Sequence, residues 1–205
     1  MMDKYHELLR QISNAAIACD RNPREITLIA VSKTYPLDDI LPVYNDGCKD
    51  FGESRIQEAI PKIECAPNDI RWHLIGTLQK NKVRKAIGKF TLIHSVDSLS
   101  LAEKISTTSL EMNIKTQILF QPREDEVPKE LFDLPGIEVK GLMAIAPNTN
   151  NETVIRKCFS NLRKLRDSLG LPILSMGMSN DFKIAIEEGA THLRIGSAIF
   201  GTRET

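Results

Sequence analysis

Residues 26–47 read ITLIAVSKTYPLDDILPVYNDG, and the fold can be worked out from this stretch outward. The apolar, β-branched run at 26–32 is typical of a short strand buried on both faces, as in a parallel sheet. Pro36 suits the first turn of a helix, and the acidic residues after it favour a helix N-terminus. Gly47 is a typical residue at the end of a helix. The stretch therefore predicts one strand followed by one helix.

The same unit of strand and helix recurs along the chain. The clearest helix is predicted at 151–169, where apolar residues recur at helical spacing, and a shorter one is predicted at 181–188. Strands are predicted at 26–32, 50–53, 71–76, 92–96, 115–120, 138–145, 173–177 and 192–195. Alternating strands and helices imply parallel pairing with right-handed crossovers. Eight such units predict an α/β fold, a (β/α)8 TIM barrel, with an open doubly wound sheet as the alternative.

An additional helix is predicted before the first strand. Residues 3–19 carry an apolar face at helical spacing, formed by Tyr5, Leu8, Leu9, Ile12, Ala16 and Cys19. Because no linker or low-complexity tract interrupts the chain, we expect residues 1–205 to form a single domain, with the helix within 1–20 packed on the barrel.

Composition excludes several classes of function. Lys and Arg together number 27, as do Asp and Glu, so the chain lacks the basic excess that nucleic-acid binding usually requires. No apolar run is long enough to span a membrane, and the N-terminal residues do not resemble a signal peptide. The four cysteines lie far apart and away from the histidines, which predicts free thiols in the cytoplasm and no metal site.

Lys33 directly follows the first predicted strand. In a (β/α)8 barrel the chemistry lies at the carboxyl ends of the strands, so this lysine is placed where a reactive amine would be. A lysine at such a position can form a Schiff base with a carbonyl compound. The alternative is a lysine that only caps the adjacent helix or extends its amine to solvent.

Small and hydroxyl residues follow the seventh and eighth predicted strands, in SMGMSND at 175–181 and RIGSAIFG at 194–201. Gly177 and Ser179 lie in the first of these stretches, and Gly196 and Ser197 lie in the second. The loops after strands 7 and 8 often bind phosphate in such barrels, although a serine here can also be an ordinary helix cap. Arg194 lies within the last strand, where an arginine is costly unless it is paired with an anion or an acceptor.

A reactive amine beside a phosphate site suits two kinds of ligand, pyridoxal 5'-phosphate or a phosphorylated sugar aldehyde.

A lone histidine in a strand, such as His73, faces either the barrel interior or the helix layer and is more often part of the core.

The sequence resembles the pyridoxal phosphate homeostasis protein family, the YggS or PROSC proteins, from about residue 26 to 203. The resemblance rests on AVSKT at 30–34, FGESRIQE at 51–58, WHLIGTLQKNK at 72–82, GLMAIAP at 141–147, SMGMSND at 175–181 and RIGSAIFGTR at 194–203. It implies a single barrel like the N-terminal domain of alanine racemase.

The resemblance also implies roles for individual residues. Lys33 would hold pyridoxal 5'-phosphate as an aldimine, and Arg194 would face the pyridine nitrogen. Ser179, with backbone from Met178, Gly196 and Ser197, would form the phosphate site. His73 and Ser54 would lie near the ring. The sequence departs from the family at Ser54, where asparagine is usual, and in the loop from Gln121 to Glu130, which lacks a KxG element.

Three functions remain open from the sequence. The resemblance favours a cofactor-binding protein that buffers or delivers pyridoxal phosphate, without catalytic residues, as a monomer and with pyridoxal-phosphate-dependent apo-enzymes as partners. An amino-acid racemase of weak activity would need an acid or base opposite Lys33, which barrel-type racemases take from a second domain. A Schiff-base aldolase would share Lys33 and the phosphate site but would not need Arg194.

Overall fold

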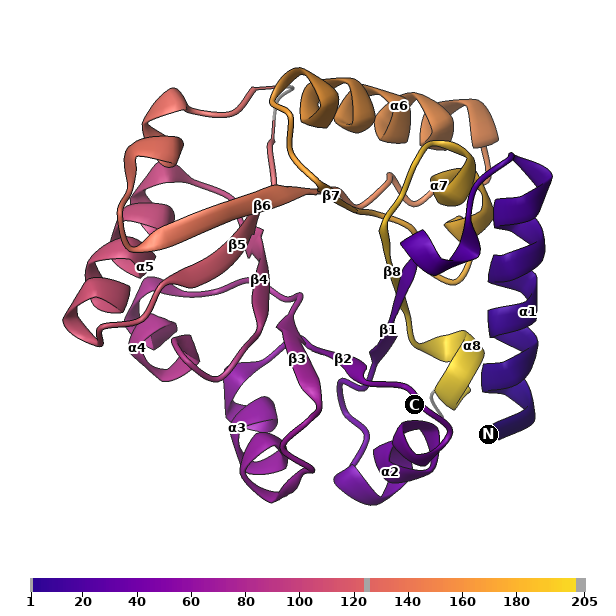
Figure 1. The fold of residues 1–205 in the computed structure, drawn as a ribbon, viewed down its shortest axis with the longest axis horizontal. Helices are drawn as coiled ribbons and strands as arrows, with labels where there is room; N and C mark the ends of the chain where they lie inside the picture. Colours follow the sequence, from indigo (N-terminus) through magenta and orange to yellow (C-terminus); the bar gives the residue numbers. More distant parts are fainter. Residues whose placement is uncertain (1, 124–125, 202–205) are drawn as a thin grey trace.

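A computed structural model describes residues 2–123 and 126–201. The described residues form eight parallel strands, which close into a barrel in chain order (Figure 1). The strands are β1 (Thr27–Val31), β2 (Asp50–Glu53), β3 (Arg71–Leu74), β4 (Leu92–Val96), β5 (Thr116–Phe120), β6 (Ile137–Met143), β7 (Ile173–Ser175) and β8 (His192–Ile195). The closure between β1 and β8 pairs Thr27 with His192 and Ala30 with Ile195. The predicted barrel is thus confirmed, and the open sheet is excluded.

Helices surround the barrel in Figure 1. They are α1 (Met2–Ala18), α2 (Leu37–Asn45), α3 (Ile56–Cys65), α4 (Val83–Ala86), α5 (Leu99–Glu111), α6 (Glu152–Ser168), α7 (Phe182–Glu187) and α8 (Ser197–Phe200), with short 3-10 turns η1 (Pro23–Glu25), η2 (Lys80–Lys82) and η3 (Lys129–Asp133). In the altered loop from Gln121 to Glu130, residues 124–125 lie outside the described part of the chain.

Helix α1 packs against α7 and α8 on the outside of the barrel. Tyr5, Leu8 and Ile12 are buried there, as their spacing predicts. Beyond the end of α1, the Arg21 guanidinium donates to the carbonyl of Ile186 in α7 at 2.7 Å, which adds a polar contact to this packing. Leu9 differs from the prediction, because its position at the edge of the apolar face leaves its side chain 37% exposed.

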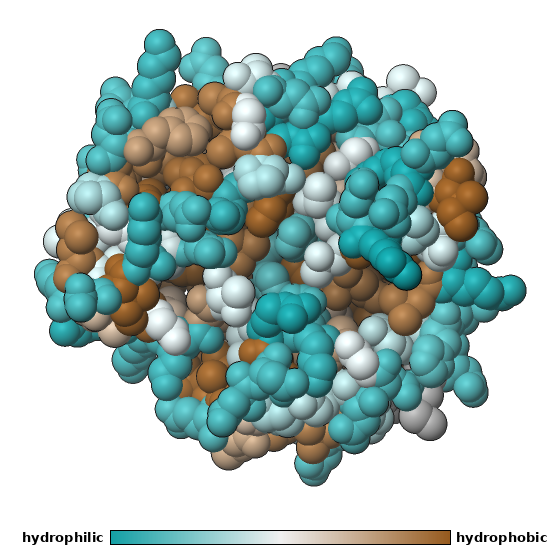
Figure 2. Space-filling view, in the orientation of Figure 1, coloured by the Kyte–Doolittle hydropathy of each residue, from teal (hydrophilic) through white to brown (hydrophobic). Residues whose placement is uncertain are grey.

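Hydrophilic residues line much of the outline of the molecule, with apolar residues among them (Figure 2). No helix of the described residues is both long and apolar enough to cross a membrane. Inside the barrel, Leu92, Leu119 and Met143 form a small apolar cluster with Ile173. The interior also contains buried polar residues, among them His73, His94, Ser175 and Arg194. This polar part of the interior continues into the candidate site.

Candidate functional site

A cavity of about 790 Å³ opens at the carboxyl ends of the strands, where the barrel architecture places active sites. Its lining comes from the segments that follow β1, β2, β3, β6, β7 and β8. The cavity is lined by seven of the residues singled out from the sequence: Lys33, Ser54, Met178, Ser179, Arg194, Gly196 and Ser197.

Lys33 lies on a tight turn directly after β1. The turn is closed by a hydrogen bond from the Tyr35 backbone N–H to the carbonyl of Ser32 at 3.1 Å. Lys33 is partly buried and lines the cavity, whereas its neighbour Ser32 is fully buried. Lys33 therefore lines the cavity, whereas the Ser32 hydroxyl is bonded to Glu53 of β2.

Ser179 and Ser197 bring together the loops after β7 and β8. The Ser197 hydroxyl donates to Ser179 Oγ at 2.8 Å, and both residues line the cavity. Two hydroxyls that share one hydrogen bond retain a second hydrogen for a ligand. This pair can therefore donate to an anion such as a phosphate.

The backbone of Met178 is engaged elsewhere. Its N–H donates to Asp181 Oδ1 at 2.5 Å, so it does not point freely at a ligand. Helix α7 begins only at Phe182, three residues after Ser179. Ser179 thus lies in the turn before the helix and is not its N-cap, which is Asp181.

Gly177 allows the turn after β7 to pass close to α7. It has a φ of +95°, and a Cβ built on it would lie 2.6 Å from the Ala185 Cβ. Both observations require glycine at this position. The close packing holds the turn that carries Ser179 against α7.

Arg194 reaches the cavity from within the barrel wall and is only 5% exposed. Its guanidinium donates to Ser175 Oγ at 2.7 Å and to the carbonyl of Ala144 at 2.8 Å. Burial lowers the pKa of Arg194 to about 10, while Asp181 acts to raise it. Arg194 therefore remains a cation at neutral pH, held by neutral acceptors.

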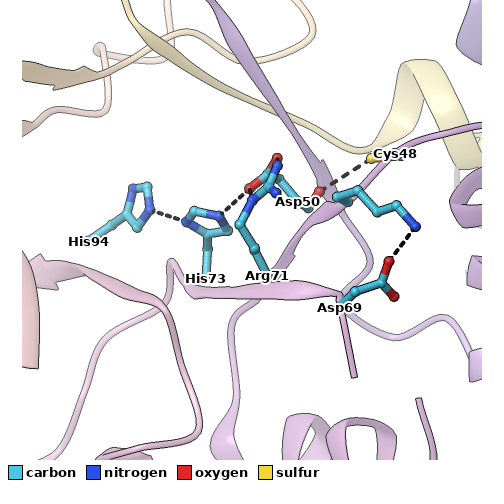
Figure 3. Close-up of polar contacts among 7 residues, drawn as sticks. Cys48, Asp50, Asp69, Arg71, His73 and His94 are labelled. Carbon is cyan, nitrogen blue, oxygen red and sulfur yellow. Dashed lines mark hydrogen bonds and ion pairs between the residues drawn. The ribbon is translucent and has the colours of Figure 1, made fainter. Parts of the chain in front are cut away.

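His73 lies deeper in the barrel than the cavity. Its two ring nitrogens contact His94 Nε2 at 2.9 Å and Asp50 Oδ1 at 3.0 Å (Figure 3). His73 does not line the cavity. The residue of this segment that does is Ile75, two positions later in the chain. Two residues along a strand amount to roughly 7 Å. The expectation that His73 lies near a ring bound in the cavity therefore differs from its observed place.

A continuous chain of hydrogen bonds links Asp50, at the amino end of β2, to Arg194. Hydrogen bonds from His73 and Arg71 lower the pKa of the Asp50 carboxyl to about 2, although burial alone would raise it. Asp50 is therefore ionised and accepts from His73 Nε2. When His73 Nδ1 accepts, His94 Nε2 donates to it, and the Ser175 hydroxyl donates to His94 Nδ1 at 2.9 Å.

Burial and the neighbouring His73, Arg194 and His192 lower the pKa of His94 well below its ordinary value. His94 is thus neutral at neutral pH, so its Nδ1 can accept from Ser175. Ser175 Oγ, having donated to His94, accepts from Arg194. The chain of hydrogen bonds therefore fixes the position of the guanidinium at the cavity.

Sequence reasoning missed several residues of the site. Tyr35 and Ile145 line the cavity, as do Asn148, Thr149, Asn150 and Glu152 in the segment after β6. The rule that barrel sites lie at strand ends would have identified that segment. The sequence does not reveal the role of Ser175, because that role depends on contacts with Arg194 and His94 in other strands.

The described residues contain no group of three His, Cys, Asp or Glu side chains that could hold a metal ion. Across the same part of the chain, none of the four cysteines forms a disulfide. The groups that line the cavity include the Lys33 amine, the Arg194 guanidinium, several hydroxyls and the carboxylates of Asp181 and Glu152.

Comparisons with known proteins identify relatives of this chain. The family model described as alanine racemase, N-terminal domain, matches residues 10–204. The pyridoxal phosphate homeostasis protein of Aquifex aeolicus is 40% identical over 223 residues, covering 98% of each chain. That of Escherichia coli K12 is 34% identical, covering 100% of this chain and 98% of its own.

Solved structures are also similar. PipY of Synechococcus elongatus, determined with PLP bound, has a TM-score of 0.81 and 36% identity, covering 93% of this chain and 100% of its own. An alanine racemase of Clostridium difficile has a TM-score of 0.73 and 16% identity, covering 96% of this chain and 56% of its own. The second likeness shows the fold alone.

Proposed function

Because this chain belongs to the pyridoxal phosphate homeostasis protein family, we propose that it binds pyridoxal 5'-phosphate and serves the homeostasis of this cofactor. The observation that carries the proposal is that Lys33, Ser179, Ser197 and Arg194 line one cavity. PipY, a similar protein with PLP bound, supports the same ligand.

The side chains in the cavity fit the chemistry of this ligand. When bound, pyridoxal phosphate supplies an aldehyde, a pyridine ring and a phosphate. The Lys33 amine can condense with the aldehyde, which forms a carbon–nitrogen double bond and releases one water. The hydroxyl pair of Ser179 and Ser197 can donate to phosphate oxygens.

Arg194 favours binding over turnover. A guanidinium that remains charged disfavours a proton on a pyridine nitrogen that faces it, and the unprotonated ring is a weaker electron sink. Tyr35 lines the cavity, but its hydroxyl donates to the carbonyl of Gly201 at 3.2 Å. This engagement supports a carrier or buffer in place of an amino-acid racemase.

The racemase alternative has a direct test. A racemase exchanges the α-proton of its substrate with solvent, so alanine in heavy water would gain deuterium. We expect no exchange above that of free pyridoxal phosphate at the same concentration. Exchange that depends on the protein would establish the racemase instead.

We also propose that the protein acts in the cytoplasm as a monomer and passes its cofactor to pyridoxal-phosphate-dependent apo-enzymes. The absence of disulfides among its described cysteines supports a reducing compartment. Sedimentation of the purified protein, and transfer to an apo-enzyme across a range of protein concentrations, test the last two statements.

Absorbance tests the cofactor assignment. Added pyridoxal phosphate should give the wild type a visible band that differs from that of the free aldehyde. Lys33→Ala should lose this band and retain weak binding through Ser179 and Ser197. The matched control Lys80→Ala changes an exposed lysine outside the cavity and should keep the band. A wild type without the band would refute the assignment.

A further inference from the structure

A buried ion pair lies directly behind the turn that carries Lys33. The carboxylate of Glu53, at the end of β2, is fully buried, and Lys62 of α3 has a side chain only 12% exposed. Lys62 Nζ lies 2.8 Å from Glu53 Oε1. Removing two charges from water is costly, so the stability of the fold alone is a weak explanation for such a pair.

Both members of the pair contact Ser32. The Ser32 hydroxyl donates to Glu53 Oε1 at 2.6 Å, and Lys62 Nζ donates to the Ser32 carbonyl at 3.0 Å. That carbonyl belongs to the peptide group joining Ser32 to Lys33. The ion pair therefore holds the backbone at the residue that presents the amine.

The turn needs such restraint. Thr34 has a φ of +72°, a conformation that is unfavourable for a β-branched residue. On the far side of the turn, the Tyr35 ring stacks on Phe200 with centroids 4.8 Å apart. The ion pair thus restrains the chain before Lys33, and the stacking restrains it after Lys33.

We propose that Glu53 and Lys62 are positioning residues for Lys33. They fix the Ser32–Lys33 peptide so that the amine meets the aldehyde without first being ordered, which speeds bond formation. This inference rests on the proposed function, because it assigns a task to the same amine.

The test separates cofactor binding from bond formation. Pyridoxine 5'-phosphate has the ring and phosphate but no aldehyde, so its dissociation constant reports the cavity alone. Stopped-flow absorbance with saturating pyridoxal 5'-phosphate reports the rate of bond formation at Lys33. We expect Lys62→Met and Glu53→Gln to slow this rate by about 10- to 100-fold and to leave pyridoxine phosphate binding nearly unchanged.

Lys62→Arg keeps a cation and its hydrogen-bond donors, so it should restore most of the rate. Arg163→Met is the matched control, because it removes a cation that lies 3.2 Å from the mostly buried Glu188 elsewhere in the fold. It should leave both measurements unchanged.

Where a single variant fails to fold, Glu53→Gln with Lys62→Met leaves no uncompensated charge, and Ser32→Ala removes one link while keeping the pair. Unchanged rates in these variants would overturn the proposal. So would a parallel loss of pyridoxine phosphate binding, since it would indicate a general effect on the cavity. A wild type without a visible band would refute the proposed function instead.

Discussion

The Ser175 hydroxyl accepts a hydrogen bond from the buried Arg194 guanidinium at 2.7 Å. The same oxygen lies 2.9 Å from His94 Nδ1, so one serine joins the cavity to the interior chain of hydrogen bonds that ends at Asp50. Its own donor faces His94, and its lone pairs face the cation. Among the described residues, the contacts of this guanidinium are with neutral acceptors and include no ion pair with a carboxylate.

Ser175→Ala should destabilise the protein by about 1–3 kcal/mol, because it leaves a buried guanidinium with one acceptor fewer. Urea unfolding measures this loss. Ser168→Ala, at an exposed hydroxyl, is the control and should change stability little. A Ser175→Ala protein as stable as the wild type would show that Arg194 does not depend on this contact.

Ser179→Ala should weaken binding of pyridoxal 5'-phosphate by about tenfold, since a hydrogen bond to a charged group contributes about 1.5–3 kcal/mol. Binding of pyridoxal, which has no phosphate, should remain the same. Competition against both ligands distinguishes the two cases. An equal loss of affinity for pyridoxal would show that Ser179 does not act through the phosphate.

Acid should destabilise the fold through its buried histidines. Burial, with His73 next, lowers the pKa of His192 to about 4, and the pKa of His94 is also depressed. The unfolded chain, with histidine pKa values near 6.5, binds more protons below that pH. Stability is therefore complete above about pH 6.5 and falls towards pH 4, by at most about 1.4 kcal/mol per pH unit for each histidine.

Urea midpoints at pH 7.5 and pH 5 measure this slope. His192→Gln should reduce the slope, whereas His6→Gln, at an exposed histidine, should preserve it. Asp50 acts in a lower window, since its pKa of about 2 affects stability only as the pH falls below about 4. A slope that His192→Gln leaves intact would contradict this account.

Gly177→Ala should destabilise the turn before α7 and weaken cofactor binding together. Its φ of +95° and the 2.6 Å approach to Ala185 leave no room for a methyl group. We expect a cost of at least about 1 kcal/mol, measured by urea unfolding. Gly47→Ala shares the positive φ but has open space around it, so it separates strain from steric overlap.

The sequence predicted the barrel well because the required patterns are local. Each strand is a short apolar run with its own turn residues, and all eight were found within two residues of the observed ends. Lys33 and the paired serines were found because they follow strands, where the barrel architecture concentrates ligands.

The remainder of the site depends on contacts between distant segments. The depth of His73 follows from the register of β3, and the engagement of Met178 follows from a turn that Asp181 closes. The link from Lys62 to the Ser32 carbonyl spans 30 residues. Neither local propensity nor a motif specifies such contacts before the strands and helices are assembled.

The central claim is that Lys33 forms the covalent bond to the cofactor. Its most direct test is borohydride reduction of the protein with pyridoxal 5'-phosphate, followed by mass mapping of its peptides. We predict that the added mass lies on the peptide containing Lys33 and is absent in Lys33→Ala. Label on another lysine, or on none, would contradict the claim.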